Sequence, residues 1–284
     1  MGKDYYEVVI QPNRSWLYVD WKGLLHYRDL LWLLVRRDFV SKYKQTILGP
    51  LWFFLQPFLT ALIFALVFAR GIKIPTDGLP PFLFYFCGLV PWGYFSQCLL
   101  ATSQSLSANA HILGKVYFPR LVIPLSIVIS NVAAMVIQLV TFLSFYFYFK
   151  FFTPASSLIQ PNEFLLLLPF LFLQAAMLSL GFGLWIAALT VKYRDFQHLV
   201  GFLTQLWMYA TPIIYPLSVV PERLRWLAVL NPMAVIVEGF RYGFFGVGFL
   251  DVGYWAVSFG MTCFFLVSGV LVFNRVERTF VDTI

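Results

Sequence analysis

Charge is missing from six long stretches of this 284-residue chain, which contain no Lys, Arg, Asp, Glu or His. The stretches cover residues 51–69, 82–102, 121–149, 164–190, 199–214 and 252–273. Most of them reach the roughly 20 residues that an α-helix needs to cross a hydrocarbon core of about 30 Å. Proton- or ion-coupled transporters and intramembrane enzymes keep ionisable groups at bilayer depth, so this absence argues against both classes.

Cysteine is scarce as well. Cys87, Cys98 and Cys263 all lie inside apolar stretches and show no metal-ligand spacing, so we expect buried free thiols and no metal site. The first 50 residues carry many charges and no short apolar segment beside a small-residue cleavage site. A signal peptide is therefore not expected, and the first apolar stretch should act as its own insertion signal.

The composition favours a membrane protein. Hydrophobic residues make up 60% of the chain, charged residues make up 12%, and 32 residues are Phe. A soluble domain of this balance would expose large apolar patches. We predict an all-α membrane protein of six transmembrane helices. Its parts are an N-terminal segment (1–50), a six-span domain (51–273) and a C-terminal tail (274–284).

The positive charges are distributed unevenly between the two sides of such a bundle. One side carries 14 of the 20 Lys and Arg residues. The six on the other side are Arg70, Lys73, Lys150, Arg223, Arg225 and Arg241. The positive-inside tendency places both termini in the cytoplasm. The formal charge of +7 is then explained by the membrane topology and by attraction to anionic lipid heads. No nucleic-acid partner is expected.

The segment before the first span predicts a helix at the membrane interface. Residues 30–35 are an unbroken apolar patch, and Phe39, Val40, Tyr43 and Ile47 then follow helical spacing up to a break at Gly49-Pro50. The basic residues expected at the lipid heads are Arg36, Arg37, Lys42 and Lys44. Alternatively, this helix caps the bundle without contacting any partner.

Two connections on the cytoplasmic side have the composition of protein contact sites. Residues 103–120 and 191–198 are short segments that hold Tyr, Phe and Arg, residue types that anchor protein interfaces. Their positive charge is also explained by membrane topology alone. The sequence leaves both readings open.

Between the fifth and sixth spans, residues 215–250 predict a re-entrant helical hairpin. Two apolar pieces, 224–230 and 233–246, are each too short to cross a membrane and return. Asn231 is a favourable N-cap and Pro232 suits the first helical position, so we expect a helix from there to Gly246. Irregular backbone at membrane depth is tolerated only against protein or a water-filled cavity, which places the hairpin near a conduit. Glu238 and Arg241 are three residues apart and are expected to pair; a purely structural ion pair is the alternative.

Six strings in order resemble a known family, the permease subunits of ABC-2 type exporters of lipid-linked polysaccharides such as O-antigen, capsule and teichoic acid. They are YRDL (27–30), KYKQTILGPLW (42–52) followed by QP (56–57), GLVPW (88–92), LGKVYFPR (113–120), YRDF (193–196), and NPM (231–233) with EGFR (238–241). The resemblance extends collinearly from about residue 27 to residue 278.

The resemblance implies contacts with an ATPase subunit. The residues expected to dock it are Asn109, His111, Lys115, Tyr117, Phe118, Tyr193, Arg194 and Asp195. The residues similar to an outer gate are Asn231, Pro232, Glu238 and Arg241. Implied partners are two ATPase copies, a second copy of this chain, a polyprenyl-linked polysaccharide and membrane lipids, in the inner membrane of a bacterium.

The chain itself lacks the motif that ATP hydrolysis would require. It has no Gly-x-x-x-x-Gly-Lys-Ser/Thr phosphate loop, and a cytoplasmic segment of about 50 residues is too small for a nucleotide-binding domain. We therefore expect no catalytic residue and no cofactor on this chain, with ATP and Mg²⁺ bound by the partner ATPase.

An uncharged conduit suits a polyhydroxylated chain, which would slide past aromatic rings without being held by ion pairs. The candidate lining residues are Trp92, Tyr94, Trp207, Tyr209 and Tyr215, although an interfacial aromatic belt would use the same residue types. A competing function is an ABC-2 exporter of a drug, a lipid or another small amphiphile. A membrane enzyme is disfavoured, because the external loops hold no closely paired carboxylates.

Overall fold

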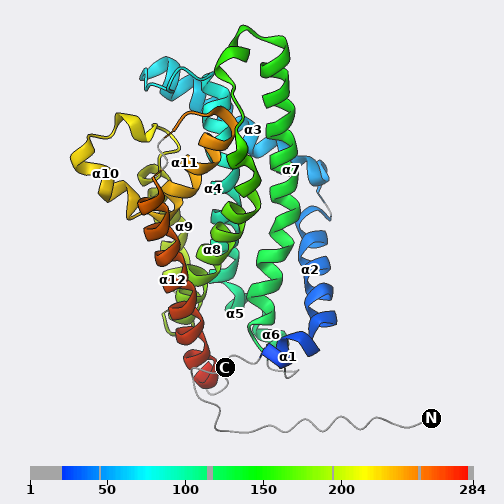
Figure 1. Cartoon of the computed structure of the whole chain (residues 1–284). Helices are drawn as coiled ribbons and strands as arrows, with labels where there is room; N and C mark the ends of the chain where they lie inside the picture. Colours follow the sequence, from blue (N-terminus) through cyan, green and yellow to red (C-terminus); the bar gives the residue numbers. More distant parts are fainter. Residues whose placement is uncertain (1–20, 45, 114–117, 194, 249–250, 281–284) are drawn as a thin grey trace.

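The computed structural model describes residues 21–44, 46–113, 118–193, 195–248 and 251–280. In these ranges the regular elements are all helices (Figure 1), which confirms the predicted all-α class. Five segments are long and apolar enough to cross a membrane: Gly49–Gly71, Pro81–Ser103, Val122–Phe152, Glu163–Lys192 and Val252–Val276. They correspond to the first four and the last of the six apolar stretches.

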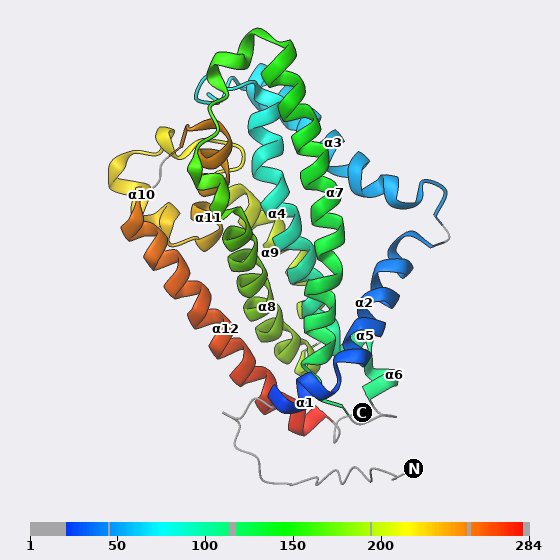
Figure 2. The same ribbon diagram turned by 45° about the vertical axis from the view of Figure 1, so that its right-hand side comes forward.

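Two helices precede the first of these segments, α1 (Trp21–His26) and α2 (Arg28–Tyr43). α2 lies along the lower half of α7 (Val122–Phe152) in Figures 1 and 2. Leu34 is only 3% exposed there, whereas Trp32 and Leu33 on another face are 62% exposed. A helix with uncovered Trp and Leu beside basic residues has the composition of a membrane-interface helix.

The predicted apolar stripe of α2, which extended to Ile47, was wrong at its C-terminal end. α2 stops at Tyr43, so Ile47 lies outside it and is fully exposed in the connection to the first span. Gly49 has a positive φ of 51° and Pro50 follows it in a 3-10 turn, Gly49–Leu51. This backbone is incompatible with a helix that continues to residue 49.

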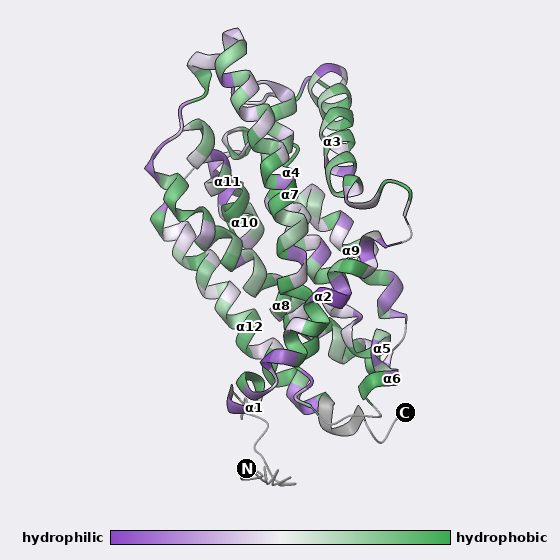
Figure 3. Cartoon of the chain, turned by 90° about the vertical axis from the view of Figure 1, so that its right-hand side faces the viewer, coloured by the Kyte–Doolittle hydropathy of each residue, from purple (hydrophilic) through white to green (hydrophobic). Residues whose placement is uncertain are grey.

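The first span consists of α3 (Trp52–Phe64) and a π-helical turn (Ala65–Gly71). Only 6% of the residues in its most apolar window are buried. Figure 3 shows apolar colour along α3, at the side of the molecule. The rest of the chain thus fully buries very few residues of the first span.

The centre of the bundle is α4 (Pro81–Ser103), which packs against α7, α8 (Leu168–Lys192) and α11 (Pro232–Phe245). α8 also lies along α12 (Val252–Phe280). Gly181 allows their close approach, because a Cβ at that position would lie 2.6 Å from the backbone carbon of Phe265. Small residues permit such contacts between helices in membranes.

The fifth apolar stretch forms a shorter helix than expected. α9 (Phe196–Ala210) has 15 residues, about 22 Å of helix, and is therefore not among the five candidate spans. After it come a turn, a 3-10 helix (Leu217–Val219), α10 (Glu222–Val229) and α11. The predicted bounds of α11 are confirmed: the Asn231 side chain caps its start and Gly246 ends it at a φ of 68°.

Two short helices, α5 (Ser105–Ala108) and α6 (Ala110–Leu113), connect α4 to α7. In Figures 1 and 2 they lie at the same end of the bundle as α1 and the end of α12. We call this the loop end. The connection between α7 and α8, at the opposite end of the bundle in Figures 1 and 2, contains two more 3-10 helices, Pro154–Leu158 and Glu163–Leu167.

Candidate functional site

At the loop end, an amide network joins α2 to the connection between α4 and α7, here called the first loop (residues 104–121). Asn109 is 7% exposed and lies between α5 and α6. Its Nδ2 donates to the carbonyl oxygen of Ser105 at 2.9 Å, and its Oδ1 accepts from Nη2 of Arg37 at 3.1 Å. Arg37 also donates to Asp38 at 2.8 Å. A charge-assisted hydrogen bond from Arg37 to Asn109 therefore holds α2 and the first loop together.

The first loop also contacts the segment that joins α8 to α9, here called the second loop (residues 191–198). Nε2 of Gln197 at the start of α9 donates to Oγ of Ser107 at 3.0 Å. Oγ1 of Thr190 at the end of α8 donates to the carbonyl oxygen of Ser103 at 3.3 Å. The two loops that the sequence singled out are thus brought to one surface.

The predicted docking residues differ in exposure. His111, Tyr193 and Asp195 are exposed, whereas Asn109 is buried in the network described above. Phe118 is 4% exposed and packs with Leu34 of α2 against the start of α7. Lys115, Tyr117 and Arg194 lie outside the described residues. A partner that approaches the loop end meets His111, Tyr193 and Asp195 first.

The basic residues of α2 also differ in their contacts. Arg36, Lys42 and Lys44 are exposed as whole residues, as expected of residues at lipid heads. The end of the Lys42 side chain reaches α7, where Nζ donates to Oδ1 of Asn131 at 2.5 Å. Partial burial of the ammonium group lowers the pKa of Lys42. Arg37 therefore attaches α2 to the first loop, and Lys42 attaches it to α7.

The five candidate lining aromatics occupy different depths of the protomer. Trp92 and Tyr94 are 5% and 4% exposed, so both are internal in α4. Tyr209 at the end of α9 is 46% exposed. Tyr215 is half-buried, and its hydroxyl donates to the carbonyl oxygen of Ala210 at 3.3 Å. Trp207 is intermediate in exposure, and its ring centroid lies 6.5 Å from that of Trp92.

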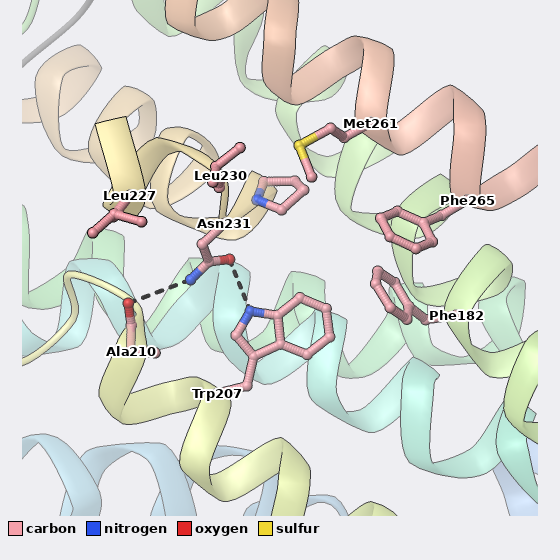
Figure 4. Close-up of a pocket in the computed structure, with 9 residues that line it drawn as sticks. Phe182, Trp207, Ala210, Leu227, Leu230, Asn231, Met261 and Phe265 are labelled. Carbon is pink, nitrogen blue, oxygen red and sulfur yellow. Dashed lines mark hydrogen bonds between the residues drawn. The ribbon is translucent and has the colours of Figure 1, made fainter. Parts of the chain in front are cut away.

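Trp207 forms one wall of a pocket of about 310 Å³ at the junction of α8, α9, α10 and α12 (Figure 4). The lining residues are Phe182, Trp207, Ala210, Leu227, Leu230, Asn231, Pro232, Met261 and Phe265. The Phe182 ring stacks on Phe265 with centroids 4.0 Å apart and meets Trp207 edge-on at 4.8 Å. An aromatic cluster thus faces an apolar space.

Asn231 organises the turn between α10 and α11. Its Oδ1 accepts from Nε1 of Trp207 at 2.8 Å and from the backbone N–H of Met233 at 3.1 Å. Its Nδ2 donates to Oγ1 of Thr211 at 2.8 Å and approaches the carbonyl oxygen of Ala210 at 3.4 Å. One side chain therefore caps α11 and fixes the hairpin to the end of α9.

Glu238 and Arg241 form an internal ion pair on α11, as the spacing predicted. Nη1 of Arg241 lies 2.5 Å from Oε1 of Glu238, and both residues are at most 1% exposed. Arg241 also donates to the carbonyl oxygen of Pro212 at 2.9 Å, and its guanidinium carbon is 3.9 Å from the ring centroid of Phe84 on α4. Leu217 N–H donates to Glu238 at 3.3 Å. The pair ties the 211–217 turn to α11 and α4.

Sequence reasoning missed the uncharged polar groups inside the spans. Nε2 of Gln174 on α8 donates to Oγ of Ser258 on α12 at 2.8 Å, and Gln138 on α7 is 3% exposed beside Gly93 of α4. A lone amide in an apolar helix is itself a signal of a helix contact. Among the described residues, no group of three His, Cys, Asp or Glu side chains is placed to hold a metal ion.

The family model described as ABC-2 type transporter matches residues 29–245, from α2 through the two loops to the end of α11. This chain belongs to the ABC-2 type transporter family. It is therefore a membrane transport protein, in agreement with the family resemblance seen in the sequence.

Similar proteins from three bacteria cover most of this ABC-2 chain. The O-antigen export system permease protein RfbA of Myxococcus xanthus is 33% identical over 227 residues, which are 79% of this chain and 83% of that protein. The protein of the same name from Klebsiella pneumoniae is 28% identical over 254 residues, 89% of this chain and 94% of that one. The capsule polysaccharide export inner-membrane protein CtrC of Neisseria meningitidis serogroup B is 23% identical over 229 residues, which are 80% of this chain and 83% of that protein. Two of these relatives are thus named as permease proteins of O-antigen export, and the third is named as an inner-membrane protein of capsule polysaccharide export.

Proposed function

We propose that this chain is the transmembrane permease of an ABC exporter that moves a lipid-linked polysaccharide of the O-antigen or capsule type across the cytoplasmic membrane of a bacterium. The observation that carries the proposal is the near full-length similarity to permeases named for O-antigen export. The absence of ionisable residues from the six apolar stretches supports a neutral conduit and an external energy source.

In the membrane, α9 would be the fifth of six spans and the α10–α11 hairpin would enter from the outer side. A contact between the hairpin tip and α12 supports entry of the hairpin into the membrane: Oγ of Ser258 donates to the carbonyl oxygen of Pro232 at 3.0 Å. Ser258 lies six residues into α12, about 9 Å below its start. The 15 residues of α9 are too short to cross the hydrocarbon core, and the turn and hairpin would then fill the remaining thickness. Six spans place both termini on the side with 14 of the 20 Lys and Arg residues, the cytoplasm.

The loop end would bind the ATPase subunits, one for each permease. His111 in the first loop and Tyr193 and Asp195 around the second are exposed on this end, and the Gln197–Ser107 hydrogen bond joins the two loops. ATP and Mg²⁺ would be bound by those subunits. Closure of the ATPase pair would move both loops together, and with them the ends of α4, α7, α8 and α9.

Two copies of the permease would enclose the conduit. α9 presents an uncovered apolar stripe of Leu199, Phe202, Leu206 and Tyr209, while Val200 and Thr204 on its other face are buried. Uncovered spans in one protomer are surfaces for lipid or for a second copy. We propose that Tyr209 and Tyr215 contact the polysaccharide first. Trp92, Tyr94 and Trp207 would form the layer behind them and reach the chain only when the helices part.

A charge reversal at the second loop tests the docking surface. Asp195→Lys should lower the amount of co-purified ATPase by about tenfold, the effect of roughly 1.4 kcal/mol of lost interface free energy, and should reduce surface polysaccharide in a complemented deletion strain. Glu163→Lys is the matched control, because Glu163 is exposed in the connection between α7 and α8, away from the loop end. It should leave both measurements unchanged.

The same deletion strain separates the polysaccharide from other cargo. Loss of this chain should cause a lipid-linked glycan to accumulate inside the cell and to disappear from the surface. Accumulation of a drug or free lipid with normal surface glycan would refute the polysaccharide assignment and leave the small-amphiphile exporter. Undiminished ATPase binding by Asp195→Lys would refute the docking assignment only.

A further inference from the structure

The pocket at the hairpin tip offers nothing to a charged or polar ligand. Among its nine described lining residues none is charged, and the amide of Asn231 already makes hydrogen bonds through both its oxygen and its nitrogen. Trp207 Nε1 is also engaged, with Asn231. A sugar or a phosphate group would lose its hydration here without gaining a partner. The lining therefore favours hydrocarbon.

The pocket borders the surface that the bilayer covers. Two of its walls come from α8 and α12, which both belong to segments long and apolar enough to cross a membrane. Leu227 and Leu230 of the hairpin line it and are 48% and 47% exposed, so the space is open on that side (Figure 4). Val267 on another face of α12 is 58% exposed. Hydrocarbon chains are thus the molecules present at its opening.

We propose that this pocket binds one acyl chain of a membrane phospholipid, which enters sideways between α10 and α12. Its end would pack against Trp207 and the stacked rings of Phe182 and Phe265. The volume of 310 Å³ is enough for the end of such a chain, since an apolar cavity of about 150 Å³ already holds a benzene-sized ligand. The proposal rests on the membrane placement that belongs to the proposed function, and it does not depend on the identity of the exported polymer.

The bound chain has a structural consequence. The hairpin contacts α12 mainly through α11, including the Ser258–Pro232 hydrogen bond, and less through α10. An acyl chain in the pocket fills the space between α10 and α12 that side chains leave open, which restores dispersion contacts to the lining residues. The lipid would therefore hold the hairpin at a fixed distance from the last span.

Photolabelling of the full chain in phospholipid vesicles tests the proposal. A trace of phosphatidylethanolamine with a diazirine near the end of one acyl chain is activated by light, and labelled peptides are mapped by mass spectrometry. We expect labelling of Met261 in the pocket and of Val267, which faces bulk lipid and serves as the internal control. Ala210→Phe, which fills the pocket, should reduce the label on Met261 by about tenfold and leave that on Val267 unchanged.

A second variant and a second probe make each outcome decisive. Leu227→Phe fills the pocket from the hairpin side, in case Ala210→Phe does not insert. A Met261 label that neither variant reduces would refute the pocket as a binding site. Selective labelling of Met261 by a diazirine polyprenyl phosphate, with none by the phospholipid, would overturn the phospholipid assignment. Protection of Met261 from both probes would also overturn it, in favour of a protein contact. None of these results requires an ATPase or export.

Discussion

The first and second spans are adjacent in sequence and in space, yet the protomer covers them in opposite ways. In the most apolar window of Gly49–Gly71, only 6% of residues are buried, whereas in Pro81–Ser103 the share is 78%. The more exposed span is also the more apolar, with a mean hydropathy of 2.1 against 1.3. In a soluble protein the order would be reversed.

The difference shows what drives burial in a bilayer. Lipid solvates apolar side chains as well as protein does, so α3 gains little from being covered. α4 carries polar groups that lipid cannot satisfy, such as Tyr94, whose hydroxyl donates to the carbonyl oxygen of Val128 at 3.3 Å. It also carries Phe84, which contacts the internal Arg241. The less apolar helix is central because its polar atoms and its rings need protein partners.

The largest expected effect comes from breaking the ion pair that α4 helps to cover. Arg241→Ala should cost about 3–5 kcal/mol of unfolding free energy, because it leaves Glu238 buried without its cation. Arg70→Ala, at the exposed end of the first span, should change it by less than about 0.5 kcal/mol. Unfolding titrations with sodium dodecyl sulfate in mixed micelles measure both. Equal losses would contradict the contrast between the two spans.

A smaller effect is expected from matched leucines. Leu83 in α4 is completely buried and Leu66 in the first span is 48% exposed. Leu83→Ala should cost about 2–4 kcal/mol through the cavity that it leaves, and Leu66→Ala less than about 1 kcal/mol because lipid fills the space. The same titrations apply. A large loss for Leu66→Ala that depends on protein concentration would show that a second copy covers the first span.

The smallest effect is expected from adding one methyl group. A Cβ at Gly93 of α4 would lie 2.8 Å from Oε1 of Gln138, whereas at Gly71 the nearest atom is 3.6 Å away. Gly93→Ala should lower the midpoint of thermal unfolding through about 1 kcal/mol of overpacking. Gly71→Ala should be neutral or slightly stabilising, since alanine favours helix more than glycine does. A stabilised Gly93→Ala would mean that Gln138 moves aside freely.

Local signals in the sequence were sufficient where a single residue sets the backbone. The bounds of α11 follow from the cap at Asn231 and the left-handed Gly246, and the Glu238–Arg241 pair follows from helical spacing. The five candidate spans follow from apolar length. These features need no knowledge of distant residues.

The remainder depends on contacts that spacing does not encode. That Trp92 is internal while Tyr209 is exposed is set by which helices surround α4 and α9. The cation–π contact of Arg241 with Phe84 joins two residues that are 157 positions apart in the sequence. The early end of α2 at Tyr43 reflects the backbone at Gly49-Pro50, which the apolar stripe through Ile47 concealed.

The shortness of α9 has a mechanical consequence. Its first turn holds Gln197, which is hydrogen-bonded to Ser107, and its last turn holds Trp207, which is hydrogen-bonded to Asn231 at the tip of the hairpin. The stretch of uninterrupted helix from Gln197 to Trp207 forms a stiff strut of about 15 Å between these two contacts. A displacement of the helix at Gln197 would therefore be carried to Asn231 without passing through a flexible joint, so the first loop and the tip of the hairpin share one rigid axis.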